Sequence, residues 1–363
     1  MVQLSIPSGV VAAGASLQLD GEAQPQLNAG LQSLSVSETI EGLYRCEARF
    51  GNWGSPNGVP DFLYFDRTRL DFGQELTVTL GNGDGRGEVF RGQISALEGQ
   101  FHDRETPQIV VLAEDSAQAL RQNRRSRTFE DVSDADVFEQ IASDHSLQTE
   151  IDVPTVNYPV IAQLNQSDLA FVRDRARRLA AEIWIADNTL FVQSRSVRAD
   201  NEEMILQFKS GLLKFSVIAD TATQPTEVVV SGWYVPAKEP LTYTADDSLI
   251  AQEIGGDDSG ASIVQQAFGS RSDRLVQQVP LTLDEAQSLA EASFRAQARR
   301  FVVGTGVARG DARLRVGRQI SLRGLGPLFS GQYYVSEVTH LFRRGPGGGY
   351  STEFVVERPG LGR

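Results

Sequence analysis

The sequence predicts a mainly β fold with α+β insertions, in which two similar antiparallel barrel or sandwich units accompany a small α+β domain. Three observations support this prediction. Residues 70–112 and 313–357 contain short runs of alternating polarity, residues 116–205 change to the period of helices, and the two strand-rich parts resemble each other. At 363 residues, the chain is long enough for two or three domains with cores of their own.

The first strand-rich domain is expected over residues 1–115. Leu76, Val78 and Leu80 alternate with polar residues, which places one face of a strand in a core. The glycine-rich run 82–85 predicts a tight turn after this strand, because glycine accepts positive φ. Two further strands are expected at residues 89–97 and 108–112.

A small α+β domain is expected over residues 116–205. Ser133 with Asp136 three residues later is typical of a helix N-terminus, where a side chain accepts a hydrogen bond from a free backbone N–H. Ser167 predicts a second helix start. The pair Asp187–Asn188 lies between two apolar runs and predicts a β-hairpin.

The second barrel domain is expected over residues 206–363. An apolar run over residues 227–233 predicts a buried strand that ends in Gly232 and Trp233. Strands resume over residues 313–357, which we expect to form the rest of the barrel.

Two features interrupt this second domain. Residues 245–275 are polar and rich in glycine, which predicts a long loop. Thr282 and Glu285 have the spacing of a capping box, and they predict a helix over residues 283–301.

The two strand-rich parts share an F-x-G-Q motif between alternating strands. It reads Phe90 to Gln93 with Gly92 in the first part, and Phe329 to Gln332 with Gly331 in the second. Chance similarity between glycine-flanked strands is the alternative to a duplication. If the duplication is real, we expect Gly92 and Gly331 at equivalent positions, with matching barrels whose glycines are out of register as the alternative. Three chains would then present six similar barrels in a ring.

Composition excludes several partners and sites. The chain has 34 Lys and Arg against 47 Asp and Glu, a net charge of −13, which disfavours nucleic acid and anionic membrane surfaces. Cys46 is the single cysteine, so an internal disulfide and a Cys-rich zinc site are both excluded, and a reducing compartment is favoured. No run is apolar enough to span a bilayer, and the uncharged N-terminus lacks the basic residues of a secretory signal.

Candidate catalytic residues are few. The pair Asp144–His145 is interpreted as a helix C-terminus, where the helix dipole favours a histidine, and not as an acid/base pair. His340, on a predicted strand, is expected to make a structural hydrogen bond. Residues 82–88 fail the pattern of a calcium loop. We therefore expect no catalytic residues, no metal and no cofactor.

Two arginine-rich runs are the only basic clusters of the sequence. They lie at residues 121–127 and 173–178. We expect solvated surface at both, with contacts to acidic neighbours in an oligomer as the alternative.

Several segments together resemble the phage late-control protein D family, the baseplate hub proteins of contractile tails, and the hub portion of VgrG spike proteins. The most specific segment runs from Gly331 to Phe354 and contains His340, Tyr350 and Thr352. The other segments are residues 120–129 with the helix after them, 167–172 leading into the Trp184 hairpin, 228–233 with Lys238 soon after, and the helix at 285–290.

The resemblance implies a homotrimer with two tube-like barrel domains per chain. Its ring would adapt the hexameric inner tube to a trimeric spike, and its partners would be the spike, a tube or tube-initiator protein and baseplate wedge components. Phe90, Gly92, Gly232, Trp233, Phe329 and Gly331 would be structural residues of this fold. Because the sequence stops at Arg363, just after the second barrel, we expect a separate spike polypeptide.

The resemblance further implies a protein that is made in the bacterial cytoplasm and assembled into a tail or injection particle. We expect a structural protein and not an enzyme. The alternatives are a tail-associated cell-wall hydrolase and a carbohydrate-binding β-module.

Overall fold

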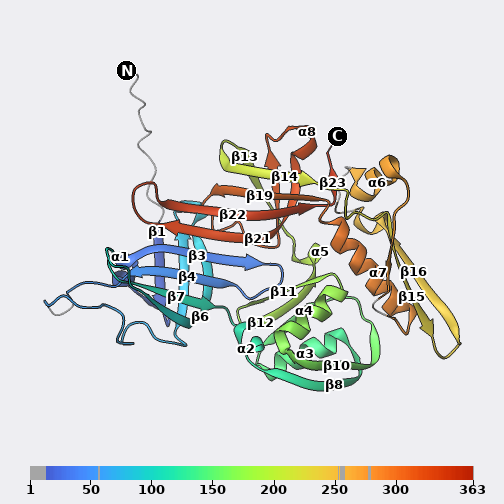
Figure 1. Cartoon of the computed structure of the whole chain (residues 1–363), viewed down its shortest axis with the longest axis horizontal. Helices are drawn as coiled ribbons and strands as arrows, with labels where there is room; N and C mark the ends of the chain where they lie inside the picture. Colours follow the sequence, from blue (N-terminus) through green and yellow to red (C-terminus); the bar gives the residue numbers. More distant parts are fainter. Residues whose placement is uncertain (1–13, 56–57, 252, 254–257, 277–278, 363) are drawn as a thin grey trace.

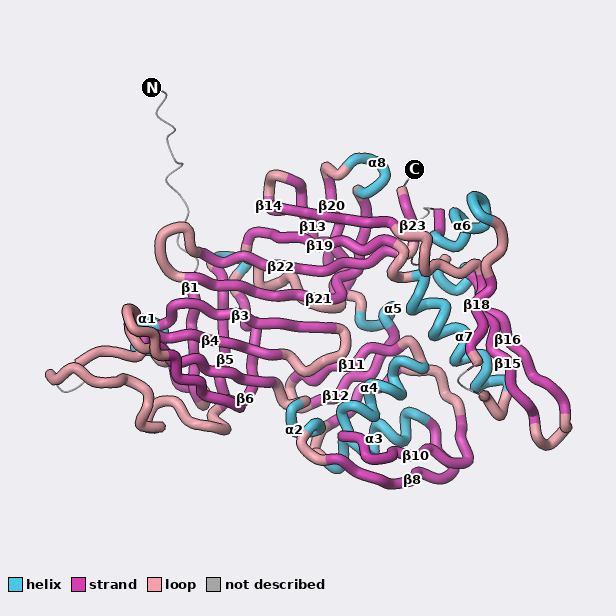
Figure 2. The backbone as a smooth tube through the Cα atoms, in the orientation of Figure 1, coloured by secondary structure: helices cyan, strands magenta, loops and turns pink. Residues whose placement is uncertain are grey.

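The computed structural model describes residues 14–55, 58–251, 253, 258–276 and 279–362 (Figure 1). Strands dominate these residues, and two barrel-like units lie side by side with two α+β units packed beside them (Figures 1 and 2). The mainly β fold with α+β insertions is confirmed. None of the described helices is long and apolar enough to cross a membrane.

The first barrel is a six-stranded antiparallel sheet that curls around a core containing Leu17, Val36 and Phe50. The order is β1-β5-β6-β7-β4-β3. The strands are β1 (Gly14–Leu19), β3 (Leu31–Thr39), β4 (Arg45–Gly51), β5 (Glu75–Gly81), β6 (Gly87–Gln100) and β7 (Gln108–Glu114). The short strand β2 (Glu22–Ala23) pairs with β1, and helix α1 (Pro25–Gly30) follows it and leads into β3.

The second barrel is closed, because its strands pair in a complete circle. The circle is β13-β14-β19-β22-β21-β20 and back to β13. The strands are β13 (Asp200–Phe208), β14 (Gly211–Ala219), β19 (Val302–Arg309), β20 (Arg318–Arg323), β21 (Gly331–Arg343) and β22 (Gly349–Arg358), with helix α8 (Gly326–Phe329) between β20 and β21. Tyr333, Val335 and Phe354 lie in its core. The expected boundary between residues 205 and 206 lies inside β13.

Five strands of the two barrels correspond in chain order and in pairing. Strands β3, β4, β5, β6 and β7 match β14, β19, β20, β21 and β22, and both sets are antiparallel throughout. The expectation of two similar barrels is therefore confirmed. The sixth strands differ, because β1 is antiparallel to β5 whereas β13 is parallel to β20.

Equivalent irregularities fix the alignment of the two barrels. Strand β6 has a bulge at Ser95 and β21 has one at Ser336. The hydroxyl of Ser95 donates to the carbonyl of Leu112 (3.3 Å), and that of Ser336 donates to the carbonyl of Val355 (3.4 Å). Leu112 and Val355 hold the same position next to the two bulges. The same bulge, with the same hydrogen bond from a serine hydroxyl to a carbonyl of the neighbouring strand, therefore occurs in both barrels.

Two glycines repeat in the same alignment. Gly73 and Gly317 both have positive φ, at 81° and 91°. Their backbone N–H groups donate to the carbonyls of Ile94 and Val335, the residues just before the two bulges. These contacts support an internal duplication more strongly than the F-x-G-Q motif does.

The F-x-G-Q motif itself is out of register, and the expected equivalence of Gly92 and Gly331 is wrong by two residues. Gly92 pairs with Leu76 in the position that Tyr333 takes opposite Ile320. The connections between the strands differ in length, from β5 to β6 and from β20 to β21, so equal sequence order does not give equal register.

The middle unit follows the first barrel and contains two capped helices. Ser133 accepts a hydrogen bond from the N–H of Asp136, and Ser167 accepts one from the N–H of Ala170, so both predicted helix starts are confirmed. The hairpin predicted around Asp187–Asn188 is present. The elements are α2 (Gln118–Arg121), β8 (Arg124–Ser133), α3 (Asp134–Asp144), β9 (Gln148–Asp152), β10 (Asn157–Ser167), α4 (Asp168–Arg178), β11 (Ala181–Ala186), β12 (Thr189–Ser194) and α5 (Arg195–Arg198).

A second α+β unit is inserted between β14 and β19. Its elements are β15 (Glu227–Tyr234), β16 (Glu239–Asp246), η2 (Asp247–Ile250), β17 (Asp258–Ser259), α6 (Gly260–Phe268), β18 (Ser272–Leu275) and α7 (Leu283–Ala298), and β17 pairs with β23 (Gly360–Leu361) near the C-terminus. Thr282 caps α7 as predicted. Val228 and Val230 are buried in this unit, but Trp233 lies at the exposed end of the strand.

The prediction of a long loop over residues 245–275 is wrong for the described part of that segment. Ser259 accepts a hydrogen bond from the N–H of Ser262 and begins α6, whose Val264 is fully buried. The glycines around residue 255 obscure this short helix in the sequence, because its apolar face is only two turns long.

We predict that Gly92→Ala destabilises the first barrel by about 1–3 kcal/mol. A Cβ at Gly92 would lie 2.3 Å from the carbonyl oxygen of Glu114 and 2.6 Å from the Phe90 ring. Gly85→Ala is the matched control, since its Cβ would meet only ordinary contacts at 3.5 Å. Urea unfolding measures both variants, and equal midpoints would contradict the close-approach argument.

Candidate functional site at the barrel junction

The two barrels are joined by direct backbone pairing. Strand β3 of the first barrel pairs antiparallel with β21 of the second, from Ser33 opposite Arg343 to Thr39 opposite Glu337. Strand β21 also pairs with β22 on its other side. The two barrels therefore share one continuous sheet, visible as the stack of β22, β21, β3 and β4 in Figure 2.

His340 lies at the centre of this seam. It is opposite Val36 of β3 on one side and Thr352 of β22 on the other. The Tyr350 hydroxyl lies 2.7 Å from Nδ1 of His340, and Oγ1 of Thr352 lies 3.3 Å from the same atom. Burial, followed by the nearby Arg315 charge, lowers the pKa of His340 to about 3. The imidazole is thus neutral, and one hydrogen is shared between its Nδ1 and the Tyr350 hydroxyl.

A buried carboxylate forms a second link across the seam. Glu38 of β3 is only 2 % exposed, and it makes an ion pair with Arg315 from the segment that precedes β20. The backbone N–H of Val316 donates to the same carboxylate (3.3 Å). Burial raises the pKa of Glu38, and Arg315 opposes that rise. The first barrel therefore contacts the second in two ways. Strand β3 pairs with β21, and Glu38 binds the segment that leads into β20.

A buried network around Glu182 of β11 ties the middle unit to the second barrel. Arg195 Nε donates to one carboxylate oxygen of Glu182 (3.1 Å). Arg198 Nη1 and the hydroxyl of Tyr334 donate to the other oxygen, at 3.0 and 2.5 Å. Glu182 and both arginines are less than a tenth exposed at their side chains. Such a desolvated network tolerates little change in geometry.

The same two arginines reach both barrels. Arg195 donates to Glu357 of β22 (3.0 Å), and Arg198 donates to the hydroxyl of Tyr44 in the first barrel (2.9 Å). Although burial opposes a positive charge, Glu182 and Glu357 raise the pKa of Arg195. Burial, opposed by Arg198, raises the pKa of Tyr44 to about 12.

Aromatic faces complete the network. The guanidinium of Arg198 lies 4.1 Å from the Trp184 ring centre, and that of Arg195 lies 4.1 Å from the Tyr334 ring centre. Trp184 also stacks on Phe191 with ring centres 4.8 Å apart. Three units of the chain meet at these residues.

The arginine-rich runs are not simply solvated surface, which corrects that expectation. Arg127 donates to Asp168 (2.9 Å) and to Asp144 (2.6 Å), and Arg175 makes a buried bidentate pair with Asp134. Their acidic neighbours lie within the same chain.

His145 ends helix α3, as its position in the sequence predicts. Its Nε2 lies 2.9 Å from Asp168, which also accepts hydrogen bonds from Arg127 and Gln163. The pairing partner is thus Asp168 and not the adjacent Asp144, and every group in this cluster holds another in place.

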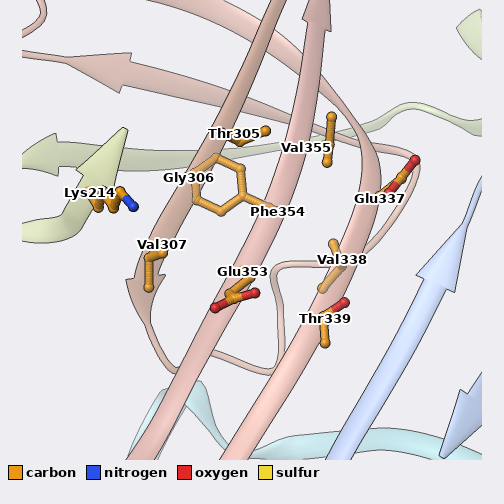
Figure 3. Close-up of a pocket in the computed structure, with 10 residues that line it drawn as sticks. All are labelled: Lys214, Thr305, Gly306, Val307, Glu337, Val338, Thr339, Glu353, Phe354 and Val355. Carbon is orange, nitrogen blue, oxygen red and sulfur yellow. The ribbon is translucent and has the colours of Figure 1, made fainter. Parts of the chain in front are cut away.

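A shallow groove of about 350 Å³ lies on the outer face of the second barrel (Figure 3). Lys214, Glu337 and Glu353 line it, together with small side chains such as Thr305 and Thr339. These residues come from β14, β19, β22 and β21, so the groove follows the same sheet that crosses the seam.

A second cavity, of about 800 Å³, lies between the first barrel and the middle unit. Phe90 and Gly92 line it beside Trp184. Asp115 in its wall accepts hydrogen bonds from the N–H groups of Tyr44 and Ala117, and burial raises its pKa to about 6.

The structure brings together only some of the residues singled out in the sequence. His340, Tyr350 and Thr352 meet at the seam. Phe329 ends helix α8 and Gly331 begins β21, whereas Gly232 and Trp233 lie in the inserted unit. Within the described residues, no group of three or more His, Cys, Asp or Glu side chains is arranged to hold a metal ion.

Sequence reasoning missed the Glu182 network. A partial signal was present, since Glu182 and Trp184 have strand spacing and Arg195 and Arg198 have helical spacing. Charged residues at such positions are usually solvated, so the pattern alone does not reveal a buried cluster.

A family model described as the Alg8 N-terminal domain matches residues 15–343. The chain belongs to this family. None of the curated proteins matches the sequence.

Solved structures resemble the chain closely in fold and weakly in sequence. A 43 kDa tail protein of prophage MuSo2 from Shewanella oneidensis has a TM-score of 0.70 at 10 % identity, covering 96 % of this chain and 99 % of that one. A tail protein from Neisseria meningitidis MC58 has a TM-score of 0.67 at 12 % identity, covering 96 % and 97 %.

A type VI secretion system component of Escherichia coli, c3393, is similar as well. It has a TM-score of 0.60 at 11 % identity, covering 94 % of this chain and 76 % of that one, and it is described as similar to the bacteriophage T4 tail proteins gp27 and gp5. The predicted resemblance to tail hub and spike-related proteins is thus confirmed at the level of fold.

We predict that Glu182→Gln destabilises the protein by about 3–5 kcal/mol, because Arg195 and Arg198 would keep buried charges without their shared partner. Glu203→Gln is the control, since Glu203 forms an exposed pair with Arg323. Chemical denaturation measures both variants. If Glu182→Gln lowers the free energy of unfolding no more than Glu203→Gln does, the network does not stabilise the protein.

We also predict a pH signature for His340. Its pKa in the folded protein is about 3, below the ordinary value of 6.5, so the unfolded chain takes up a proton first as the pH falls. The wild type therefore loses about 1.4 kcal/mol per pH unit below pH 6.5 relative to His340→Gln, which keeps an acceptor for Tyr350 but does not titrate. Unfolding curves between pH 7 and 4 test this expectation. Exposed His102→Gln is the control, and a constant gap between wild type and His340→Gln would contradict it.

Proposed function

We propose that this protein is the structural baseplate hub of a contractile tail or phage-like injection particle. Three copies would form a ring that adapts a hexameric inner tube to a trimeric spike. The observation that carries the proposal is the pair of barrels with the same five-strand pairing, joined edge to edge in one chain. The fold shared with two tail proteins, one of them from a prophage, supports it.

The arrangement suits a change of symmetry. Three chains would present six similar barrels, and a tube with sixfold symmetry can make similar contacts with each of them. The middle unit and the inserted unit differ from each other, so they would recur only three times around the ring. A spike with threefold symmetry would meet one complete set of these units per chain.

The proposal assigns the protein a mechanical role and no catalytic one. In two of the clusters described above, ionisable groups hold one another: Asp168 binds His145, and Glu182 binds Arg195 and Arg198. Buried networks of this kind favour one rigid geometry, which a load-bearing ring requires. The partners in this role are the spike protein, a tube or tube-initiator protein and wedge components of the baseplate.

We expect the assembled protein to have a mass near three times 39.6 kDa. Native mass spectrometry and light scattering, on the protein alone and co-expressed with its tube and spike proteins, provide the measurement. The isolated chain can remain monomeric if its partners complete the interfaces. A monomer or a dimer in assembled particles would rule out the ring.

The same particles separate a structural role from an enzymatic one. Particles are counted by electron microscopy, and their activity on peptidoglycan is measured in a zymogram. Hydrolysis that follows this chain, and that is lost on substitution without loss of assembly, would favour a cell-wall hydrolase.

A further inference from the structure

We propose that neighbouring copies join by strand pairing between β14 of one copy and the C-terminal half of β6 of the next. This contact would repeat, between chains, the β3–β21 seam that joins the two barrels within a chain. The inference rests on the ring proposed above and specifies its interface.

The duplication supplies the first argument. Strand β14 is the counterpart of β3, and β6 is the counterpart of β21. Within the chain, the edge of β3 binds β21. The equivalent edges, on β14 and β6, belong to opposite ends of the molecule, and no strand among the described residues pairs with them in this way.

Both edges are open in the described residues. On the side of β14 that faces away from β19, pairing with β13 involves only Gly211 and Leu212. On the side of β6 that faces away from β7, strand β5 pairs no further along β6 than Gln93. The backbone groups of residues 213–219 and 96–100 on these sides are therefore available. Such edges are ready templates for another strand.

The equivalence also gives the register of the contact. The bulges align Ser95 with Ser336, which places Glu98 in the position of Thr339. The pairing of β4 and β19 with β7 and β22 places Ile218 in the position of Ser37. Thr339 is opposite Ser37 in the seam. Glu98 of one copy should therefore lie opposite Ile218 of the next.

Large apolar side chains beside both edges are exposed to solvent. Ile218 is 61 % exposed and Leu213 is 51 % exposed on β14. Beside the β6 edge, Phe101 is 63 % exposed and packs on Phe65, with ring centres 5.4 Å apart. Exposed apolar groups at two complementary edges indicate surfaces that a partner covers.

The placement of the edges favours a ring. Figure 2 shows the strands stacked from β14 and β19, through β22, β21, β3 and β4, to β6 at the other end. An interface between two different surfaces at opposite ends is head-to-tail, and such contacts close into rings when the rotation per copy allows it.

A cysteine pair tests the register directly. In the seam, the hydroxyls of Ser37 and Thr339 lie 3.4 Å apart, so side chains at this pair of positions touch. Glu98→Cys with Ile218→Cys should therefore give covalent dimers and trimers on mild oxidation, which reducing agent returns to monomers. The native Cys46 is buried and stays out of the reaction.

Two controls match this variant. Ser37→Cys with Thr339→Cys should form a disulfide within one chain and no covalent oligomer. Glu98→Cys with Ser216→Cys uses the same exposed face of β14 but shifts the register by two residues, and it should cross-link far less. Equal cross-linking in both registers, or no covalent oligomer at any protein concentration, would overturn the proposed pairing.

A charge variant gives an independent measurement. Ile218→Glu would face Glu98 of the next copy and should weaken association about tenfold, and Glu98→Lys in the same chain should restore it. Val160→Glu, at a similarly exposed position on the middle unit, should leave association unchanged. If native mass spectrometry shows the same amount of trimer in every variant, this interface is refuted, while the proposed hub function stays intact.

Discussion

The pairing of β3 with β21 is the constraint on which the rest of the structure depends. Strand β21 is hydrogen-bonded to β22 on one side and to β3 on the other, so it belongs to both barrels at once. A slip of one residue would turn every side chain of β21 to the opposite face. His340 opposes such a slip, because its buried ring has its partner Tyr350 only in the observed register. The relative position of the two barrels is thus set by backbone geometry.

The charged network around Glu182 adds specificity to this frame. Desolvating several charges costs free energy that their mutual attraction only partly offsets, so such a cluster is a weak source of stability. The contribution of the cluster is to fix the orientation of the middle unit. Glu182 accepts from Tyr334, Arg195 donates to Glu357 and Arg198 donates to Tyr44, so the network fixes the orientation of the middle unit against both barrels. The barrels supply the cores, and the network decides how the middle unit sits on them.

Local signals carried most of what could be predicted from the sequence. Ser133 and Thr282 mark helix starts because a cap acts over three residues, and the Leu76–Leu80 alternation marks a strand because its period is local. The misses involve distant partners. Arg195 meets Glu357 from 162 residues away, and the register of β6 against β21 depends on connections whose lengths differ. Helix α6 was missed because glycines and polar residues surround its two turns.

The differences between the two barrels lie where a ring tolerates them. In the first barrel, α1 separates β1 from β3, whereas Lys209 and Ser210 alone separate β13 from β14, so β13 continues in the direction of β14 and closes the second barrel. The sixth strand has therefore diverged in direction and in closure. The seam uses other strands, β3 and β21, whose counterparts are β14 and β6, and these keep the same pairing and the same serine bulges in both barrels. The strands that join barrels have stayed alike, whereas the sixth strands, β1 and β13, have changed. If the same edge-to-edge contact is used both within and between chains, the strands that make it must stay alike, whereas the sixth strands are free to diverge.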